Sequence, residues 1–153
     1  MAEDQAVRCM QLPLRGLQLL VPNSAVAEII GYVAEQPAAL DQPWLDGLIT
    51  WRGVTIPVVS FELMCDLEAA EPGARSRIAV LYNPLESRDA LPYFGLILQD
   101  IPRGYIAQKE RMLATFDNSG CDYLAGHADP LLDNLQIPDL AALAETLAQQ
   151  LGQ

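Results

Sequence analysis

The apolar residues of this chain come in short runs, each about as long as one β-strand and each ended by turn residues. Runs of this kind that are rich in Val, Ile, Leu and Tyr predict strands, and clear examples are residues 17–21, 54–61, 77–82 and 93–98. Turn signals recur about every 8 to 12 residues, which indicates hairpins rather than alternating strands and helices. Residues 100–104 are expected to interrupt the chain, and residues 105–111 have only a weak strand pattern. The pattern predicts a mostly β fold, either a small barrel or a sandwich.

One segment near the C-terminal end has the periodicity of a helix. Asp139 is placed to act as its N-cap, and Gly152 is expected to end it. Between them, apolar residues recur at steps of three and four on one face: Leu140, Leu143, Ala144, Leu147 and Leu151. We expect this stripe to pack on its own domain, and docking of a partner is the alternative.

The most informative segment is a predicted hairpin in the first half of the chain. Residues 48–51 and 54–61 have strand composition, and Arg52-Gly53 between them predicts a tight turn. Gly53 can take the positive φ that such a turn requires. Pro57 has no N–H to donate, so we expect it at a sheet edge or a bulge.

Two tryptophans and one arginine make this hairpin a candidate binding surface. Trp44 and Trp51 flank it, and Trp is enriched in binding hot spots; packing of both in a barrel core is the alternative. Arg52 is the only basic residue in the stretch 16–74, so we expect it to meet a carboxylate. Glu28 is the candidate, and an exposed turn arginine without a role is the alternative.

The charge of the chain argues against several classes of partner. Asp and Glu number 20 against 9 Lys and Arg, for a net charge of −11. Such a surface repels phosphate backbones and anionic membranes, so we expect no nucleic-acid partner. No apolar run is long enough to span a membrane and no secretory leader is visible, so we expect no membrane insertion and a cytoplasmic location. A partner with a basic face is favoured.

The sequence offers no basis for catalysis or metal binding. Cys9, Cys65 and Cys121 are odd in number and form no close pair, so we expect small buried or partly buried thiols rather than a disulfide framework or a zinc site. His127 is the only histidine, and neighbouring Cys121 in sequence does not make a catalytic pair. No glycine-rich phosphate loop is present. We therefore expect no catalytic residue, no metal and no cofactor, and hence no enzyme.

Four stretches of the chain resemble the signature of CheW-like domains. Residues 26–30 read V-A-E-I-I, similar to the strand start V-x-E-I of the family. Residues 43–59 read P-W-L-D-G-L-I-T-W-R-G-V-T-I-P-V-V, similar to G-x-x-x-x-R-G-x-x-x-P-V-V. Residues 20–22 (L-V-P) resemble the entry to this signature, and residues 93–101 (Y-F-G-L-I-L-Q-D-I) resemble x-x-G-L-x-V-D-x-V. The resemblance covers most of the chain, and its first half is the specific part.

The resemblance implies a fold, a partner set and site residues. The fold is two small five-stranded barrels of the Src-homology type and a C-terminal helix, within one CheW-like domain over residues 7–151. The implied function is a non-catalytic adaptor that joins the cytoplasmic tip of a chemoreceptor to the regulatory domain of a CheA-type histidine kinase. The implied coupling residues are Arg52 and Glu28, and the implied turn glycines are Gly47 and Gly53. From their own chemistry we add Trp51 and Trp44 as candidate partner-binding residues and Pro57 as a residue that shapes the turn.

The chain also departs from the family pattern in places. Thr50-Trp51 stands where an aliphatic or Asn-Leu pair often precedes the Arg-Gly turn, and residues 134–138 lack the usual apolar-Asp-apolar strand. These departures favour an accessory member of the family, such as one from a pilus-type system that drives twitching motility. A small-ligand-binding or self-assembling β-barrel protein is the alternative function.

Overall fold

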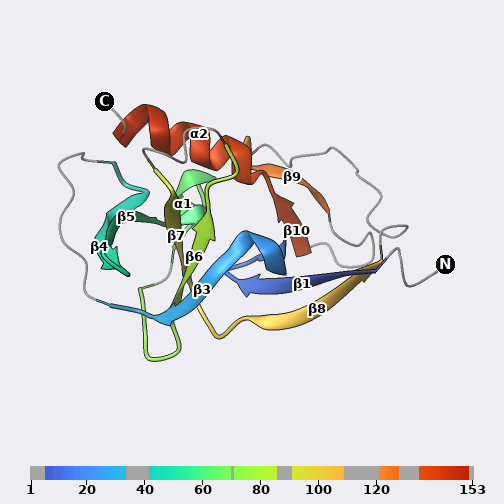
Figure 1. Cartoon of the computed structure of the whole chain (residues 1–153). Helices are drawn as coiled ribbons and strands as arrows, with labels where there is room; N and C mark the ends of the chain where they lie inside the picture. Colours follow the sequence, from blue (N-terminus) through green and yellow to red (C-terminus); the bar gives the residue numbers. More distant parts are fainter. Residues whose placement is uncertain are drawn as a thin grey trace.

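The computed structural model describes residues 6–33, 42–69, 71–85, 91–108, 121–127 and 135–151. Within these ranges the strands form two five-stranded sheets, and a helix near the C-terminal end lies across both of them (Figure 1). The expected mostly β fold of two five-stranded units with a C-terminal helix is therefore confirmed. Residues 112–116, whose composition also allows a strand, lie outside the described residues.

The first sheet combines the start of the chain with its last three strands: β1 (Ala6–Pro13), β2 (Gln18–Pro22), β8 (Arg103–Gln108), β9 (Leu124–His127) and β10 (Leu135–Pro138). Their order is β8-β1-β2-β10-β9, and the β2–β10 pair is parallel. The β1–β2 hairpin turns at Gly16, which has a φ of 81°. The sequence predicted an interruption at residues 100–104 and only a weak strand after it. In the structure β8 is a full strand, paired with β1 from Arg103 to Gln108.

The second sheet is built from the middle of the chain: β3 (Val26–Gly31), β4 (Leu45–Trp51), β5 (Val54–Val59), β6 (Arg77–Tyr82) and β7 (Tyr93–Leu98). A short 3₁₀ turn (Asn23–Ala25) leads into it from the first sheet. Its strand order is β3-β6-β7-β5-β4, which places β3 and β4 at opposite edges. The β5–β7 pair is parallel, and β4 and β5 form the predicted hairpin.

The strands β6 and β7, in the interior of the second sheet, are apolar on both faces because both faces are buried. In β6, Ala79 and Leu81 belong to a large apolar cluster shared by the two sheets, whereas Ile78 and Val80 belong to a cluster within the second sheet. All four are fully buried. Successive strand residues point to opposite faces, so an unbroken apolar run is what a doubly covered strand needs. Gly95 of the neighbouring strand has no side chain, and a Cβ there would lie 2.9 Å from Ile78 Cγ2.

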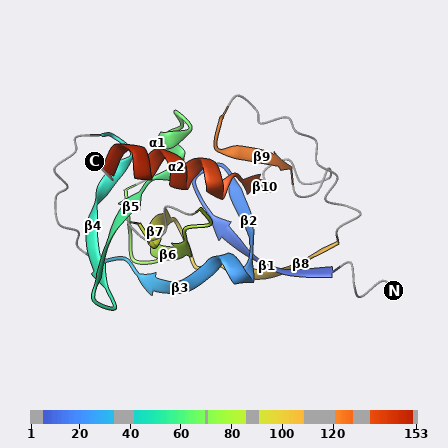
Figure 2. The ribbon, with the colours of Figure 1, turned by 45° about the horizontal axis from the view of Figure 1, so that its top comes forward.

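The C-terminal helix α2 (Leu140–Leu151) closes the shared cluster. Its start is capped as predicted, because the Ala142 N–H donates to Asp139 Oδ1 over 3.0 Å. Figures 1 and 2 show that α2 spans from the second sheet to β10 of the first. The residues of its apolar stripe that are fully buried are Leu143, Ala144 and Leu147. The stripe therefore packs on its own domain, and the predicted end at Gly152 lies outside the described residues.

A buried carboxylate joins the two sheets. Ser60 caps the short helix α1 (Phe61–Met64) by accepting from the Leu63 N–H over 3.3 Å. Glu62 in this helix is only 1% exposed. Its Oε2 accepts from the backbone N–H of Arg15, in the β1–β2 turn, over 3.1 Å and from Gln99 Nε2, just after β7, over 3.3 Å. Since a buried carboxylate is costly without donors, these bonds fix α1 between the sheets.

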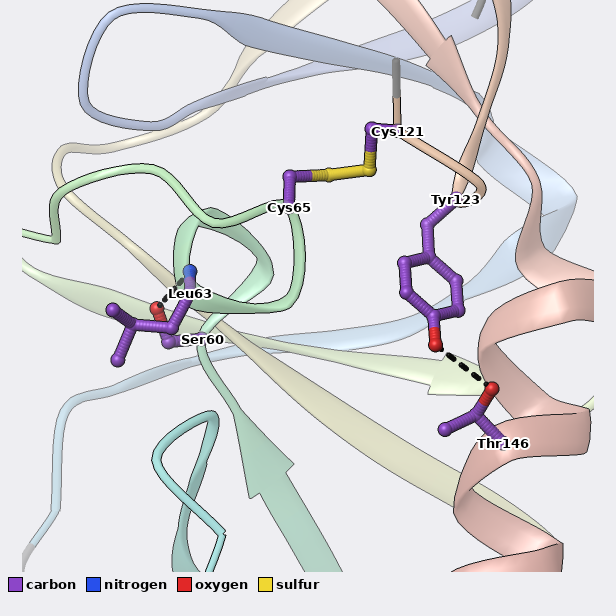
Figure 3. Close-up of a disulfide and its surroundings, with 6 residues drawn as sticks. All are labelled: Ser60, Leu63, Cys65, Cys121, Tyr123 and Thr146. Carbon is purple, nitrogen blue, oxygen red and sulfur yellow. Dashed lines mark hydrogen bonds between the residues drawn. A yellow bond between two sulfur atoms is a disulfide. The ribbon is translucent and has the colours of Figure 1, made fainter.

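The cysteines correct one expectation. Cys65, directly after α1, and Cys121, just before β9, form a disulfide with their Cα atoms 5.3 Å apart (Figure 3). The prediction of three free thiols was wrong for this pair, because 56 residues separate the two in sequence and only the folded chain brings them together. Cys9 is free and buried, as predicted, and burial raises the pKa of its thiol.

We predict that Glu62→Ala lowers the free energy of unfolding by about 2 to 3 kcal/mol, because it removes the buried carboxylate that accepts from both the Arg15 N–H and Gln99 Nε2. Urea denaturation measures the loss. Glu68→Ala is the matched control, because Glu68 is an exposed acid that pairs with the Arg15 side chain over 3.1 Å. The control is expected to change stability by less than about 1 kcal/mol. Equal losses in both variants would contradict the role of Glu62.

Candidate partner-binding site

The site lies at the tip of the β4–β5 hairpin. Arg52 and Gly53 both have positive φ, at 49° and 80°, and Trp51 pairs with Val54 across the turn. Positive φ at both residues is typical of two-residue turns, whose twist matches that of the strands. Glycine adopts this conformation freely, whereas for Arg52 it is uncommon. The turn therefore holds the Arg52 backbone at the point where the hairpin projects from the sheet.

One carboxylate connects this tip to the opposite edge of the sheet. The Trp51 Nε1–H donates to Glu28 Oε1 over 2.9 Å, and Arg52 Nη2 lies 3.2 Å from the same oxygen. The Arg52 guanidinium carbon also lies 4.9 Å from the centroid of the Trp51 ring, within range of a cation–π interaction. Glu28 is therefore the carboxylate that Arg52 meets, as predicted. We call Glu28, Trp51 and Arg52 the hairpin triad.

The hairpin triad helps to close the second sheet on itself. Glu28 belongs to β3 and Trp51 to β4, the two edges of the sheet. A second side-chain bond crosses the same seam, from Tyr32 Oη to Asp46 Oδ2 over 3.1 Å. One apolar cluster includes side chains from all five strands, which requires a strongly curved sheet. The edges are thus joined by side chains, while the backbone pairing in the sheet runs from β3 through β6, β7 and β5 to β4.

Exposure separates the roles within the triad. The Arg52 side chain is 69% exposed and that of Glu28 39%, whereas Trp51 is buried. An ion pair this exposed contributes on the order of 0 to 1 kcal/mol, so it orients the guanidinium without occupying all its donors. Trp51 packs edge-on against Tyr93 with ring centroids 4.8 Å apart. Trp51 is therefore part of the core and supports Arg52, which is the group presented to solvent.

The other tryptophan is not part of this arrangement. Trp44 is partly buried against the cluster shared by the two sheets. It precedes β4, whereas Trp51 ends that strand, so the two residues lie at opposite ends of one strand. Its carbonyl accepts from the Ser60 N–H over 2.8 Å, close to α1. The grouping of Trp44 with Arg52 in one site therefore has no support in the geometry.

Two of the residues expected to shape the turn lie elsewhere. Gly47 is inside β4, at an irregularity in its pairing with β5, and not in a turn. Pro57 is in β5, an interior strand and not an edge. The missing N–H is tolerated there because the pairing of β5 with β7 begins only at Val58. Of the three, only Gly53 lies in the turn itself.

Sequence reasoning missed the aromatic side chains that continue from the triad. Tyr82 and Tyr93 face each other as a cross-strand pair of β6 and β7, with ring centroids 5.5 Å apart. Tyr82 is exposed, so the row Trp51–Tyr93–Tyr82 runs from the core to the surface. The available signal was that both tyrosines flank the polar segment between two predicted strands, where cross-strand partners are expected.

The described part of the chain contains no group of three or more His, Cys, Asp or Glu residues that could hold a metal ion. His127 lies in β9, and its side chain is outside the described residues. A cavity of about 250 Å³ is lined in part by Asp46, Glu62 and Glu71. The buried carboxylate among them, Glu62, is already bonded to two N–H donors, so we assign the cavity no ligand. No helix among the residues described is long and apolar enough to cross a membrane.

Comparison with known proteins identifies the class to which this fold and site belong. The model of the CheW-like domain family matches residues 8–145, so the chain belongs to this family. Its structure is similar to that of the scaffolding protein CheW from Thermoanaerobacter tengcongensis. The TM-score is 0.73 at 16% identity, over 86% of this chain and 83% of that one. No curated protein sequence matches the chain.

Family membership decides the question of catalysis. CheW-like proteins are non-catalytic scaffolds of chemotaxis signal transduction, and the chain is such a scaffold. The expectation that it is not an enzyme is therefore confirmed. The departures noted in the sequence, such as Thr50-Trp51 before the turn, leave the fold intact, because Trp51 packs in the core and bonds to Glu28.

We predict that Glu28→Ala lowers the free energy of unfolding by about 1 to 3 kcal/mol, because the buried Trp51 loses the acceptor of its indole N–H. Arg52→Ala is the matched variant, and it is expected to cost less than about 1 kcal/mol because the Arg52 side chain is mostly exposed. Urea denaturation of both variants measures the difference. A loss for Arg52→Ala as large as that for Glu28→Ala would show that the roles are assigned wrongly.

Proposed function

We propose that this chain is an adaptor that couples the cytoplasmic tip of a chemoreceptor to a CheA-type histidine kinase through the regulatory domain of the kinase. The observation that carries the proposal is the state of Arg52, whose guanidinium is oriented by Glu28 and Trp51 yet is 69% exposed. An arginine held in this way reaches a partner with little further loss of side-chain freedom. Membership of the CheW-like family supports the choice of partners.

The electrostatics of the hairpin tip indicate what the partner presents there. Arg52 is the only basic residue in the stretch 16–74 of a chain whose net charge is −11. The N–H groups of a guanidinium that are not used within the protein are best bonded by a carboxylate or a backbone carbonyl of the partner. We therefore propose that a partner acid or carbonyl meets Arg52, and that the exposed Tyr82 ring is available to contact the surface beside it.

The proposal extends to location and subfamily. An adaptor between a receptor tip and a kinase works in the cytoplasm, and we propose that location for this chain. We also propose that residues 7–151 act as one domain and that the chain is an accessory member of the family from a pilus-type system. The departures from the family pattern at Thr50-Trp51 and at residues 134–138 support the accessory role.

We predict that Arg52→Glu weakens binding to the kinase regulatory domain at least about 100-fold, because a like-charge contact replaces an attractive one. Isothermal titration with the kinase of the same chemosensory system measures the loss. The melting temperature of the variant is expected to fall by no more than a few degrees, since the lost ion pair is exposed.

Arg75→Glu is the matched control for this experiment. The Arg75 side chain is 67% exposed and pairs with Asp100 over 2.7 Å, so it resembles Arg52 in exposure and pairing but lies on another part of the chain. Arg75→Glu changes the net charge by the same amount as Arg52→Glu. It is expected to bind within about threefold of the unmodified protein, because Arg75 is not part of the proposed contact. If both variants bind equally well or lose binding equally, Arg52 is not the contact.

A further inference from the structure

The disulfide between Cys65 and Cys121 has no part in the hairpin site. Cys65 is the C-cap of α1, where its N–H is 3.1 Å from the carbonyl oxygens of Phe61 and Glu62. Cys121 directly precedes the turn that leads into β9. The bond therefore ties the segment that follows the second sheet's hairpin to an edge strand of the first sheet.

Among the described residues, the segment at β9 is also held by the packing of Leu124 in the shared cluster and by a small number of polar contacts. Figure 3 shows the Tyr123 ring directed at α2, where its hydroxyl lies 3.0 Å from Thr146 Oγ1. The Tyr123 carbonyl accepts from the Asp139 N–H over 2.8 Å. Among the described residues β9 pairs with one strand, β10, across an irregular register. A short edge strand with one neighbour opens easily, so the disulfide contributes substantially to keeping β9 in its place in the sheet.

The two cysteines differ in exposure. Cys65 is partly exposed, whereas Cys121 is buried in the shared cluster. An attacking thiolate therefore reaches the Cys65 sulfur first. Cys9 does not compete, because it is buried in a separate cluster, and the raised pKa of its thiol leaves little thiolate at neutral pH.

We propose that Cys65 and Cys121 form a reversible thiol switch that sets how firmly β9 is held against α1. This rests on the proposed function for the cytoplasmic location, where glutathione and thioredoxin keep thiols reduced and the disulfides that do form are mostly redox-sensing. A pair within bonding distance, one member of which is partly exposed, fits a sensing role.

The chemistry is thiol–disulfide exchange with a dithiol. One thiolate of the dithiol attacks the Cys65 sulfur, forms a mixed disulfide with it and releases Cys121 as a thiolate, which takes up a proton. The second thiolate of the dithiol then attacks the first sulfur of the dithiol, which is bonded to Cys65. Cys65 leaves as a thiolate and takes up a proton. The dithiol leaves as a disulfide, and both cysteines are thiols. Exchange with an oxidised dithiol reverses the sequence.

Reduction is expected to loosen β9 without unfolding the chain. The shared apolar cluster and the Glu62 bonds between the sheets do not depend on the disulfide. Arg52 lies at the other end of β5 from α1, about 20 Å away for a strand of this length. The switch is therefore separate in space from the proposed partner contact, and each can be tested alone.

Hydrogen–deuterium exchange of the purified protein, with and without dithiothreitol, tests the switch. Amides of residues 121–127 are expected to exchange at least about tenfold faster in the reduced protein, while those of β4 and β5 stay unchanged. Cys65→Ser is expected to behave as the reduced form in both conditions, and Cys9→Ala is expected to keep the difference. Equal exchange at β9 in oxidised and reduced protein, or resistance of the disulfide to dithiothreitol in the folded protein, overturns the proposal.

Thiol trapping in cells tests whether the switch operates. Cells of the source organism are quenched with acid and labelled with a maleimide, before and after treatment with the thiol oxidant diamide. Free Cys65 and Cys121 thiols are expected before treatment, a disulfide after it, and free thiols again on recovery. A bond that is present throughout, or one that never forms, overturns the proposal. Neither experiment uses kinase binding, so failure of the adaptor role is seen separately in the Arg52→Glu titration.

Discussion

The carboxylate of Glu28 is the constraint on which the site depends. It accepts the indole N–H of Trp51 and pairs with Arg52, and so joins β3 to β4 at the two edges of one sheet. A five-stranded sheet with open edges would expose its inner face and offer unpaired strands to other chains. With the edges held together, the inner face becomes a core, and the same contacts orient the one guanidinium at the hairpin tip. The same Glu28 contacts therefore close the sheet and orient Arg52 toward solvent.

The rest of the architecture keeps this closed sheet in place. The cluster between the sheets takes one face of each, and α2 covers its open side. Glu62 adds a polar link that apolar packing alone would not supply, because its hydrogen bonds are directional and reach both sheets. The disulfide after α1 adds a covalent link on the same side. The scaffold is thus firm at the hairpin, while β9 is an edge strand held in part by a bond that exchange chemistry can open.

The sequence predicted those features that depend on neighbouring residues. The strands with apolar runs, the Arg52-Gly53 turn and the capped C-terminal helix are all present. The prediction was weak where a strand is polar, as in β8, which is a strand because β1 pairs with it along its whole length. It was wrong for Pro57, since composition does not show where pairing with a third strand begins. Within the site, the pairing of Arg52 with Glu28 was predicted, and the contribution of Tyr82 and Tyr93 was missed.

By itself, the sequence determined the class of fold and the family, because strand-length apolar runs and a spaced Gly, Arg-Gly and Pro-Val-Val pattern are local properties of the chain. Only the tertiary structure decided which side chains meet. It brought Glu28 of one sheet edge to Trp51 of the other, and it placed Cys65 within bonding distance of Cys121 across 56 residues. Such contacts depend on how a sheet curves and how two sheets pack, and these follow from the sum of many weak interactions that no single segment encodes.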